Sequence, residues 1–292
     1  MNLPLFFAFL SPAIFGFMNV FDTYIVKRKV KNVLGFAIVS GVTNILFGII
    51  LALFLDWSAY SFSDFRFSIL AGASLGVQLC FYYFTLSKHD VSHAVGLTYV
   101  YPIIVAILSF LFLNEKLSFI GYLGMILTLA GVLLMNMQIK KLKIKIAIWS
   151  ILILIITAAL NELFVKIATS QINGWNGTAI SSIVMGLFVM PLLLKKNVRK
   201  GFRSEFKRIK LTFISEALTI AAIGTLYLAM AGLPATIVSV ISVTQPLFVL
   251  LFEWTAFSIG IKIVKDINWK NKLFAILLIV LGIIVLYISE IV

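Results

Sequence analysis

Long apolar runs separated by short polar breaks alternate along the whole chain. The stretch from Tyr101 to Met135 shows the pattern, because Glu115 and Lys116 interrupt it once and the apolar run then resumes. A helix needs about 20 residues to cross the hydrocarbon core of a bilayer. The two halves of this stretch therefore predict two membrane helices joined by a turn at the lipid headgroups.

Ten segments have the length and apolar character of a membrane span. Each is expected to be helical, because lipid tolerates no unpaired backbone group and runs of about 20 apolar residues do not fit barrel strands. The predicted spans are Pro4–Val26, Val33–Leu55, Phe67–Ser87, Val91–Leu113, Ser118–Met137, Lys145–Ala168, Thr178–Leu194, Leu211–Ala231, Ala235–Phe257 and Leu273–Ser289. The predicted fold is an all-α integral membrane protein with ten transmembrane helices.

Composition supports lipid rather than water as the solvent. Hydrophobic residues make up 62% of the 292 residues and charged residues 12%, whereas a soluble domain is about half apolar and a quarter charged. The net charge of +13 fits basic loops at a membrane better than nucleic acid, so we expect a lipid bilayer and no nucleic acid as partner. The single cysteine, Cys80, excludes an internal disulfide. Residues 1–3 carry no basic side chain, so no cleavable signal peptide is expected.

Basic residues gather on one side when the ten spans place alternate loops on opposite faces. This side holds the bases of residues 27–31, Lys88 and the bases of 140–145, 195–210 and 262–272. The other side holds Arg66, Lys116 and Lys166. The positive-inside rule then predicts a cell-membrane protein whose basic loops are cytoplasmic and whose termini are both external.

Two parts of the chain share a register. Phe81–Pro102 and Thr225–Pro246 align with an offset of 144 residues, and the offset becomes 151 after the prolines. The matched pairs are Tyr83 with Tyr227, Thr98 with Ser242, Tyr101 with Gln245, Pro102 with Pro246, Glu115 with Asp266, Gly131 with Gly282 and, at an offset of 142, Asn19 with Asn161. Chance similarity between two apolar sequences is the alternative explanation.

The register predicts two copies of a five-helix unit, residues 1–138 and 139–292. Five is an odd number, so the second copy must enter the membrane from the opposite face. The charges agree, because the first connection of copy one holds four bases at Lys27–Lys31 and the matching connection Lys166–Gly177 holds one. Inverted repeats are typical of secondary transporters, whose substrate site lies near the midplane where the copies meet.

A known family resembles this arrangement. The proline-containing fourth span, the sequence LNEKLSFIGYLGMILTLAGVLLM (Leu113–Met135) and the five-plus-five repeat are similar to the ten-span EamA type of the drug/metabolite transporter superfamily. The resemblance covers essentially the whole chain and implies a transporter, but it says little about the substrate. Two features differ: the second copy has KDINW (Lys265–Trp269) in place of the glutamate turn, and family members commonly have their termini inside.

Polar side chains within the apolar runs are candidates for substrate contact, because such groups usually face the bundle interior or a hydrated cavity. Thr98 and Tyr101 share a helix face, as do Ser242 and Gln245, and each pair precedes a proline that frees a carbonyl about one turn upstream. A packing kink is the alternative reading. The predicted substrate-binding residues are Asn19, Gln78, Tyr82, Thr98, Tyr101, Asn161, Tyr227, Ser242 and Gln245.

Four carboxylates interrupt the apolar runs and each needs a partner, a proton or water there. Glu162 is expected to pair with Lys166 one turn away, and Asp22 to reach toward Lys27, which gives both a structural role. Glu216 and Glu253 have no such neighbour and are the candidates for proton or cation coupling. Together with the tyrosines, these acids predict a cavity for amines or other cations.

The remaining motifs exclude several functions. His89 and His93 flank Asp90 at the start of the fourth span and fit an interfacial helix cap better than a zinc site. Neither a phosphate-binding glycine loop nor a nucleophile–base motif is present, so we expect no cofactor, no metal and no enzyme activity. Small residues in Leu70–Gly76 and at Gly121, Gly124 and Gly131 predict close helix packing.

The sequence thus favours a secondary transporter of a small organic solute, a metabolite, amine or amino acid, that works by alternating access. Coupling to protons through the buried acids remains open. The alternatives are a membrane scaffold and a lipid-processing intramembrane protein without carrier activity. No pattern in the sequence specifies the oligomeric state.

Overall fold

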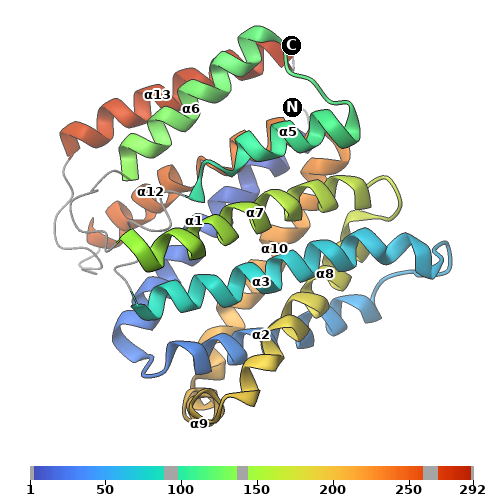
Figure 1. The fold of residues 1–292 in the computed structure, drawn as a ribbon, viewed down its shortest axis with the longest axis vertical. Helices are drawn as coiled ribbons and strands as arrows, with labels where there is room; N and C mark the ends of the chain where they lie inside the picture. The colour runs from blue at the N-terminus through green and yellow to red at the C-terminus, as the bar shows by residue number, and fades with distance from the viewer. Residues whose placement is uncertain (1–2, 89–97, 137–143, 259–268, 291–292) are drawn as a thin grey trace.

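A computed structural model of the chain describes residues 3–88, 98–136, 144–258 and 269–290, and these ranges contain helices and no strand (Figure 1). The α-helices are α1 (Leu3–Lys29), α2 (Val33–Leu53), α3 (Arg66–Lys88), α5 (Tyr101–Leu113), α6 (Phe119–Asn136), α7 (Ile144–Ala168), α8 (Gly174–Val189), α9 (Lys196–Glu205), α10 (Ile209–Gly232), α11 (Ala235–Ser242), α12 (Gln245–Ser258) and α13 (Trp269–Glu290). Short 3₁₀ helices are η1 (Phe62–Phe65), η3 (Met190–Leu194) and η4 (Phe206–Arg208).

Eight helical stretches of the described chain are long and apolar enough to cross a membrane. They are Leu3–Thr23, Val33–Leu53, Phe62–Phe84, Trp149–Ala168, Gly174–Leu194, Thr212–Gly232, Ala235–Ser258 and Lys272–Glu290. Two shorter apolar helices, Tyr101–Leu113 and Phe119–Met135, occupy parts of the fourth and fifth predicted spans. The all-α membrane prediction is confirmed for these residues, while the count of ten spans stays a prediction. The predicted cap at His89 and His93 and the position of Asp266 lie outside the described residues.

Exposed apolar side chains cover the outside of the bundle. Phe112, Trp149, Leu273 and Ile126 are each more than half exposed, and a soluble protein rarely leaves so many large apolar groups in contact with water. Polar side chains are instead found inside, where Ser40, Thr43 and others are almost fully buried. This inverted distribution fits a bundle whose outer surface contacts lipid.

The chain turns directly ahead of two prolines, and we call these two turns the helix breaks. Residues Tyr99 and Val100 form a turn before α5, and residues Val243 and Thr244 form a turn between α11 and α12. Proline has no backbone N–H and cannot continue the hydrogen-bond ladder of a helix, and Pro102 and Pro246 follow these turns by two residues. The helix breaks leave the start of α5, the end of α11 and the start of α12 inside the bundle.

Glycines bring pairs of helices into close contact. In the α6–α13 pair at the top of Figure 1, a Cβ added at Gly124 would lie 2.8 Å from the carbonyl oxygen of Gly282, and one at Gly131 would lie 2.7 Å from that of Ala275. In the α3–α8 pair, Gly72 contacts the backbone of Ser181 in the same way. The predicted close packing of Leu70–Gly76 and of the fifth span is therefore confirmed.

Three further helix pairs build the centre of the bundle. α1 packs along α10, α3 packs along α7, and α2 packs along α8. Each pair joins a helix from the first half of the chain to one from the second half, so the interior of the bundle lies between the two halves. The side chains that point into this interior form the candidate site.

Candidate functional site

An internal cavity of about 250 Å³ lies between the two halves of the chain. Its apolar wall includes Phe15 of α1, Leu75 of α3, Leu154 of α7 and Ile223 of α10. Sixteen polar side chains share the lining with these groups: Ser11, Asn19, Asp22, Ser40, Gln78, Tyr82, Tyr83, Thr98, Tyr99, Tyr101, Asn161, Glu162, Glu216, Thr219, Ser242 and Gln245. So many polar groups within an apolar bundle mark a place for a polar occupant.

Most of the residues singled out from the sequence meet at this cavity. Asn19, Gln78, Tyr82, Thr98, Tyr101, Asn161, Ser242, Gln245 and Glu216 all line it, although they come from distant parts of the chain. The helix breaks explain the position of four of them, because Thr98 and Tyr101 flank the first break and Ser242 and Gln245 flank the second.

Two of the predicted residues lie elsewhere. Tyr227 is fully buried on α10, where its hydroxyl lies 2.7 Å from Ser181 Oγ and its ring packs on Gly177 of α8. Its counterpart in the sequence alignment, Tyr83, does line the cavity. Glu253 is half-buried on α12 and is not part of the lining. The register between the two halves therefore predicted the direction of the Tyr227 side chain wrongly.

Glu162 and Tyr101 form the polar centre at one end of the cavity. The Tyr101 hydroxyl donates to Glu162 Oε1 at 2.7 Å, and Ser242 lies beside both groups. Among the described residues, Glu162 Oε2 and Ser242 Oγ are buried without a partner at hydrogen-bond geometry. Buried polar atoms are nearly always paired in native proteins, so these two atoms have free capacity for an occupant of the cavity.

The prediction that Glu162 pairs with Lys166 is wrong. The Lys166 ammonium donates to the carbonyl oxygens of Met230 at 2.9 Å and Leu233 at 2.8 Å, near the end of α10. The last carbonyls of a helix have no partner within the helix and carry partial negative charge. These carbonyls, which a one-turn spacing rule does not consider, hold Lys166 away from Glu162.

Glu216 and Asp22 form a second polar centre. Glu216 accepts hydrogen bonds from Ser40 Oγ and, at 2.5 Å, from Asn44 Nδ2, both on α2. Asp22 accepts one from Ser215 Oγ at 2.6 Å and lies close enough to Glu216 to interact electrostatically. Asp22 was expected to reach toward Lys27 and to have a structural role, but it is only 8% exposed and lines the cavity. The Ser215 hydroxyl on the facing helix α10 gives the buried Asp22 carboxyl a hydrogen-bond donor inside the bundle.

The electrostatic character of the cavity is acidic. Asp22, Glu162 and Glu216 line it, and the described lining contains no lysine, arginine or histidine. Tyr82, Tyr99 and Phe15 add aromatic rings, which attract cations through their faces. An ionised carboxylate at this depth needs a counter-charge, whereas a protonated one needs only hydrogen bonds. The site can therefore hold protons or an organic cation.

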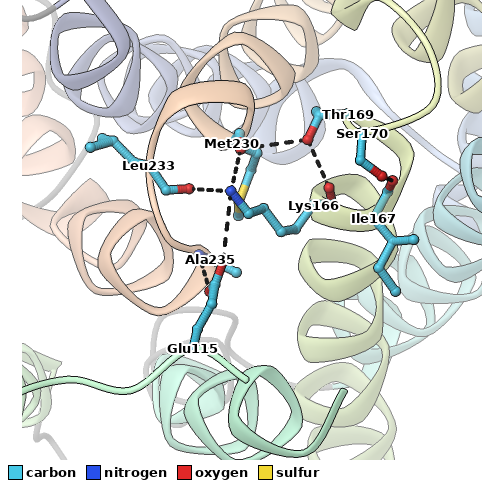
Figure 2. Close-up of polar contacts among 8 residues, drawn as sticks. All are labelled: Glu115, Lys166, Ile167, Thr169, Ser170, Met230, Leu233 and Ala235. Carbon is cyan, nitrogen blue, oxygen red and sulfur yellow. Dashed lines mark hydrogen bonds and ion pairs between the residues drawn. The ribbon is translucent and has the colours of Figure 1, made fainter. Parts of the chain in front are cut away.

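A set of contacts ties the two halves of the chain together at one end of the bundle (Figure 2). α5 ends at Leu113, and its cap residue Asn114, in the left-handed backbone region with φ 56°, directly precedes Glu115. Glu115 Oε1 lies 3.7 Å from Lys166 Nζ, and Glu115 Oε2 accepts a hydrogen bond of 2.8 Å from the backbone N–H of Ala235, the first residue of α11. We call Glu115, Lys166 and their backbone partners on Met230, Leu233 and Ala235 the Glu115–Lys166 clamp.

The clamp and the Glu216 centre lie near opposite ends of α10. Fourteen residues separate Glu216 from Met230 on this helix, which at 1.5 Å per residue is about 21 Å. Glu162 lies between, one turn from Lys166 on α7. The cavity therefore extends from the Glu162 centre, next to the clamp, toward the end of the bundle where α2 and α10 begin. The sequence predicted only a turn at the lipid headgroups around Glu115, and it gave no sign of the contact between Glu115 and Lys166.

Comparison with known proteins connects this architecture to a family. Residues 2–137 match the EamA-like transporter family, and no curated protein matches the sequence. A solved structure titled only "Crystal structure of protein" has the same fold with a TM-score of 0.66, 14% identity and coverage of 97% of this chain and 98% of that one. At that identity the structural match speaks for the fold alone. Residues 2–137 are thus similar to the EamA-like transporter family, within the drug/metabolite transporter superfamily, and the apolar helices of the described chain are those of a multi-pass membrane protein.

Proposed function

We propose that this protein is a secondary transporter that carries a small organic solute through the cavity by alternating access. The observation that carries this proposal is the polar, acidic cavity between the two halves of an apolar bundle. The family match supports a transporter. The Glu115–Lys166 clamp closes one end of the bundle by contacts that can break and reform, as alternating access requires.

The mechanism that we infer uses two inverted five-helix copies, residues 1–138 and 139–292. Several features support it. The helix breaks before Pro102 and Pro246 are 144 residues apart, and the contact of α1 with α10 has a counterpart in that of α3 with α7. The family match over residues 2–137 has the length of one copy. Rocking of one copy against the other would expose the cavity to each side in turn.

Amines are the substrate class that the cavity favours among metabolites, amines and amino acids. An ammonium group can donate to Glu162 Oε2 and Ser242 Oγ, which have no hydrogen-bond partner among the described residues, and can contact the aromatic rings nearby. Glu216 and Asp22 supply negative charge at the other end. Protons and substrate would compete for the same carboxyls, which is the simplest basis for exchange of one for the other.

The test is transport in liposomes that contain the purified full chain. A panel of amines, amino acids and neutral metabolites is first screened for binding by thermal shift, and uptake of the best compound is then driven by a pH gradient. We expect a cationic amine to bind and uptake to need the gradient. Glu216→Gln should abolish gradient-driven uptake, because glutamine cannot exchange a proton. Binding of none of the cations would contradict the proposal.

Asp56→Asn is the matched control. Asp56 lies in the exposed segment between α2 and η1, where the backbone N–H of Ser58 donates to Oδ1 at 2.9 Å and holds the pKa of this carboxyl below its usual value. It therefore stays ionised across the pH range of the assay, and its loss should leave uptake and its pH dependence unchanged. The same liposomes test the alternative of a lipid-processing protein, since only that activity would change the lipid composition.

A further inference from the structure

The connection between α8 and α10 carries a dense positive charge. Residues 195–210 contain eight lysines and arginines, and Lys196, Arg199, Lys200, Arg203 and Lys207 are all exposed. The acid of this segment, Glu205, contributes nothing to its surface because its side chain is 0% exposed. The exposed charged side chains of α9 and η4 are therefore all basic.

The geometry holds α9 at the membrane surface. The span Gly174–Leu194 ends two residues before α9 begins, and the span Thr212–Gly232 starts a few residues after η4. Both ends of α9 are thus attached to the ends of membrane spans. In Figure 1 α9 is seen end-on, whereas the long helices of the bundle lie across the view, so α9 runs along the membrane plane rather than through it.

α9 is fixed against the start of α2. Glu205 Oε1 accepts hydrogen bonds from the backbone N–H groups of Lys31 at 3.0 Å and Asn32 at 3.1 Å. Gly201 packs so closely that an added Cβ would lie 2.3 Å from the Asn32 side chain, and Val198 is buried. This side of α9 is used for protein contacts, which leaves the basic side turned outward in a defined orientation.

Apolar side chains flank the basic face. Leu194, just before α9, is 87% exposed and Phe206, just after it, is 44% exposed. A helix in the membrane interface inserts such groups at the boundary of headgroups and acyl chains while its lysines and arginines stay at the level of the phosphates. The combination of position, charge and flanking apolar groups is that of an interfacial helix.

We propose that α9 and η4 form a binding surface for the headgroups of anionic phospholipids in the adjacent leaflet. Arginine and lysine bind phosphate oxygens through charge-assisted hydrogen bonds, and clusters of them attract acidic lipids. Because Glu205 ties α9 to the start of α2, bound lipid is expected to stabilise the α2–α9 contact. This proposal concerns the membrane surface and does not depend on transport.

The test compares lipid-dependent stability of the purified full chain in detergent micelles. Phosphatidylglycerol or phosphatidylcholine is added at equal concentration, and thermal unfolding is followed. We expect phosphatidylglycerol to raise the melting temperature more than phosphatidylcholine. The triple variant Arg199→Gln, Lys200→Gln, Arg203→Gln should lose at least half of this difference, and 0.5 M salt should reduce it in the unchanged protein because headgroup contacts at the surface are screened.

A second triple variant is the matched control. Lys140→Gln, Lys141→Gln and Lys143→Gln remove the same charge from another connection, and this variant should keep the phosphatidylglycerol effect. Equal losses in both variants would show an effect of net charge and overturn the proposal, as would a full effect in the α9 variant. An α9 variant that melts like the unchanged protein in phosphatidylcholine is folded. If inorganic phosphate at the same concentration reproduces the shift, a free anion rather than lipid is the ligand, which also overturns it.

Discussion

At the scale of single residues, the two polar centres of the cavity differ in how their carboxyls are satisfied. Glu216 has donors on both oxygens, Ser40 and Asn44, whereas Glu162 has a donor on one oxygen only, the Tyr101 hydroxyl. Among the described residues, the second oxygen of Glu162 has no hydrogen-bond partner. In the proposed mechanism we therefore expect Glu162 to be the carboxyl that contacts a substrate and Glu216 the one that binds a proton.

Tyr101→Phe tests the Glu162 centre. The substitution keeps the ring but removes the donor to Glu162 Oε1, which leaves the buried carboxyl without its hydrogen bond. A buried group left unsatisfied costs about 1–3 kcal/mol, so we expect a lower melting temperature without ligand and weaker binding of the cationic substrate. Thermal unfolding with and without ligand measures both.

The control for this variant is Tyr287→Phe on α13, which removes a hydroxyl from a 40% exposed side chain far from the cavity lining. Tyr287→Phe should change neither the stability without ligand nor the free energy of substrate binding by more than about 0.5 kcal/mol. Equal behaviour of the two variants would mean that the Tyr101 hydroxyl does nothing for the site.

At the scale of helices, the Glu115–Lys166 clamp controls access in the proposed mechanism. Lys166→Met removes the ammonium and leaves Glu115 and the carbonyls of Met230 and Leu233 without it. If the clamp favours closure by ~1.4 kcal/mol, its loss increases the open population about tenfold. In a Cys80→Ser background, a cysteine at Ala158 in the cavity lining should then react about tenfold faster with an impermeant maleimide added from the clamp side.

Lys116→Met provides the comparison for the clamp. Lys116 is adjacent to Glu115 in the sequence, but its ammonium lies over the Phe110 ring at 5.2 Å and takes no part in the clamp. Labelling at residue 158 should not change in this variant. If Lys166→Met does not speed up labelling of residue 158 from the clamp side, the clamp does not control access to the cavity.

Gly124→Leu tests the close packing of α6 on α13. The new side chain would meet the backbone of Gly282 and Leu286, and overpacking of this kind costs about 1–3 kcal/mol. We expect a clearly lower melting temperature in detergent. Ile126→Leu, on the exposed side of the same helix, should melt like the unchanged protein, and a Gly124→Leu variant as stable as this control would mean that the two helices separate without cost.

At the scale of the whole molecule, the basic connection between α1 and α2 and the basic connection between α8 and α10 meet at one end of the bundle. Glu205 of α9 binds the backbone of Lys31 and Asn32 between α1 and α2, while the clamp lies at the other end of α10. Cysteines introduced at Asn32 and Lys200 in the Cys80→Ser background should therefore be labelled from the same side of intact cells. Cysteines at Ser58 and Ser170 should be labelled from the opposite side. Any other grouping would contradict this arrangement.

Hydropathy predicted the helices of this fold well, because a bilayer requires a fixed length of apolar helix whatever the helix packs against. Polar residues beside a proline within an apolar span also predicted Thr98, Tyr101, Ser242 and Gln245 at the cavity, because lipid does not solvate polar side chains and they face the interior of the bundle instead. Partners across the bundle were not predictable in this way. Lys166 binds carbonyls of α10 and Tyr227 turns toward α8, and neither contact leaves a local signature in the sequence.

The backbone partners of Lys166 have a consequence for how this protein tolerates change. The carbonyl oxygens of residues 230 and 233 belong to the main chain, so the clamp does not depend on which side chains these two positions carry, and only their burial in the core restricts them to apolar residues. Only positions 115 and 166 contribute side-chain atoms to the clamp, so only these two must keep their charged residues for the clamp to form. A library randomised at all four positions and selected for growth on the transported compound should therefore recover several different apolar residues at 230 and 233, but an acid at 115 together with a base at 166.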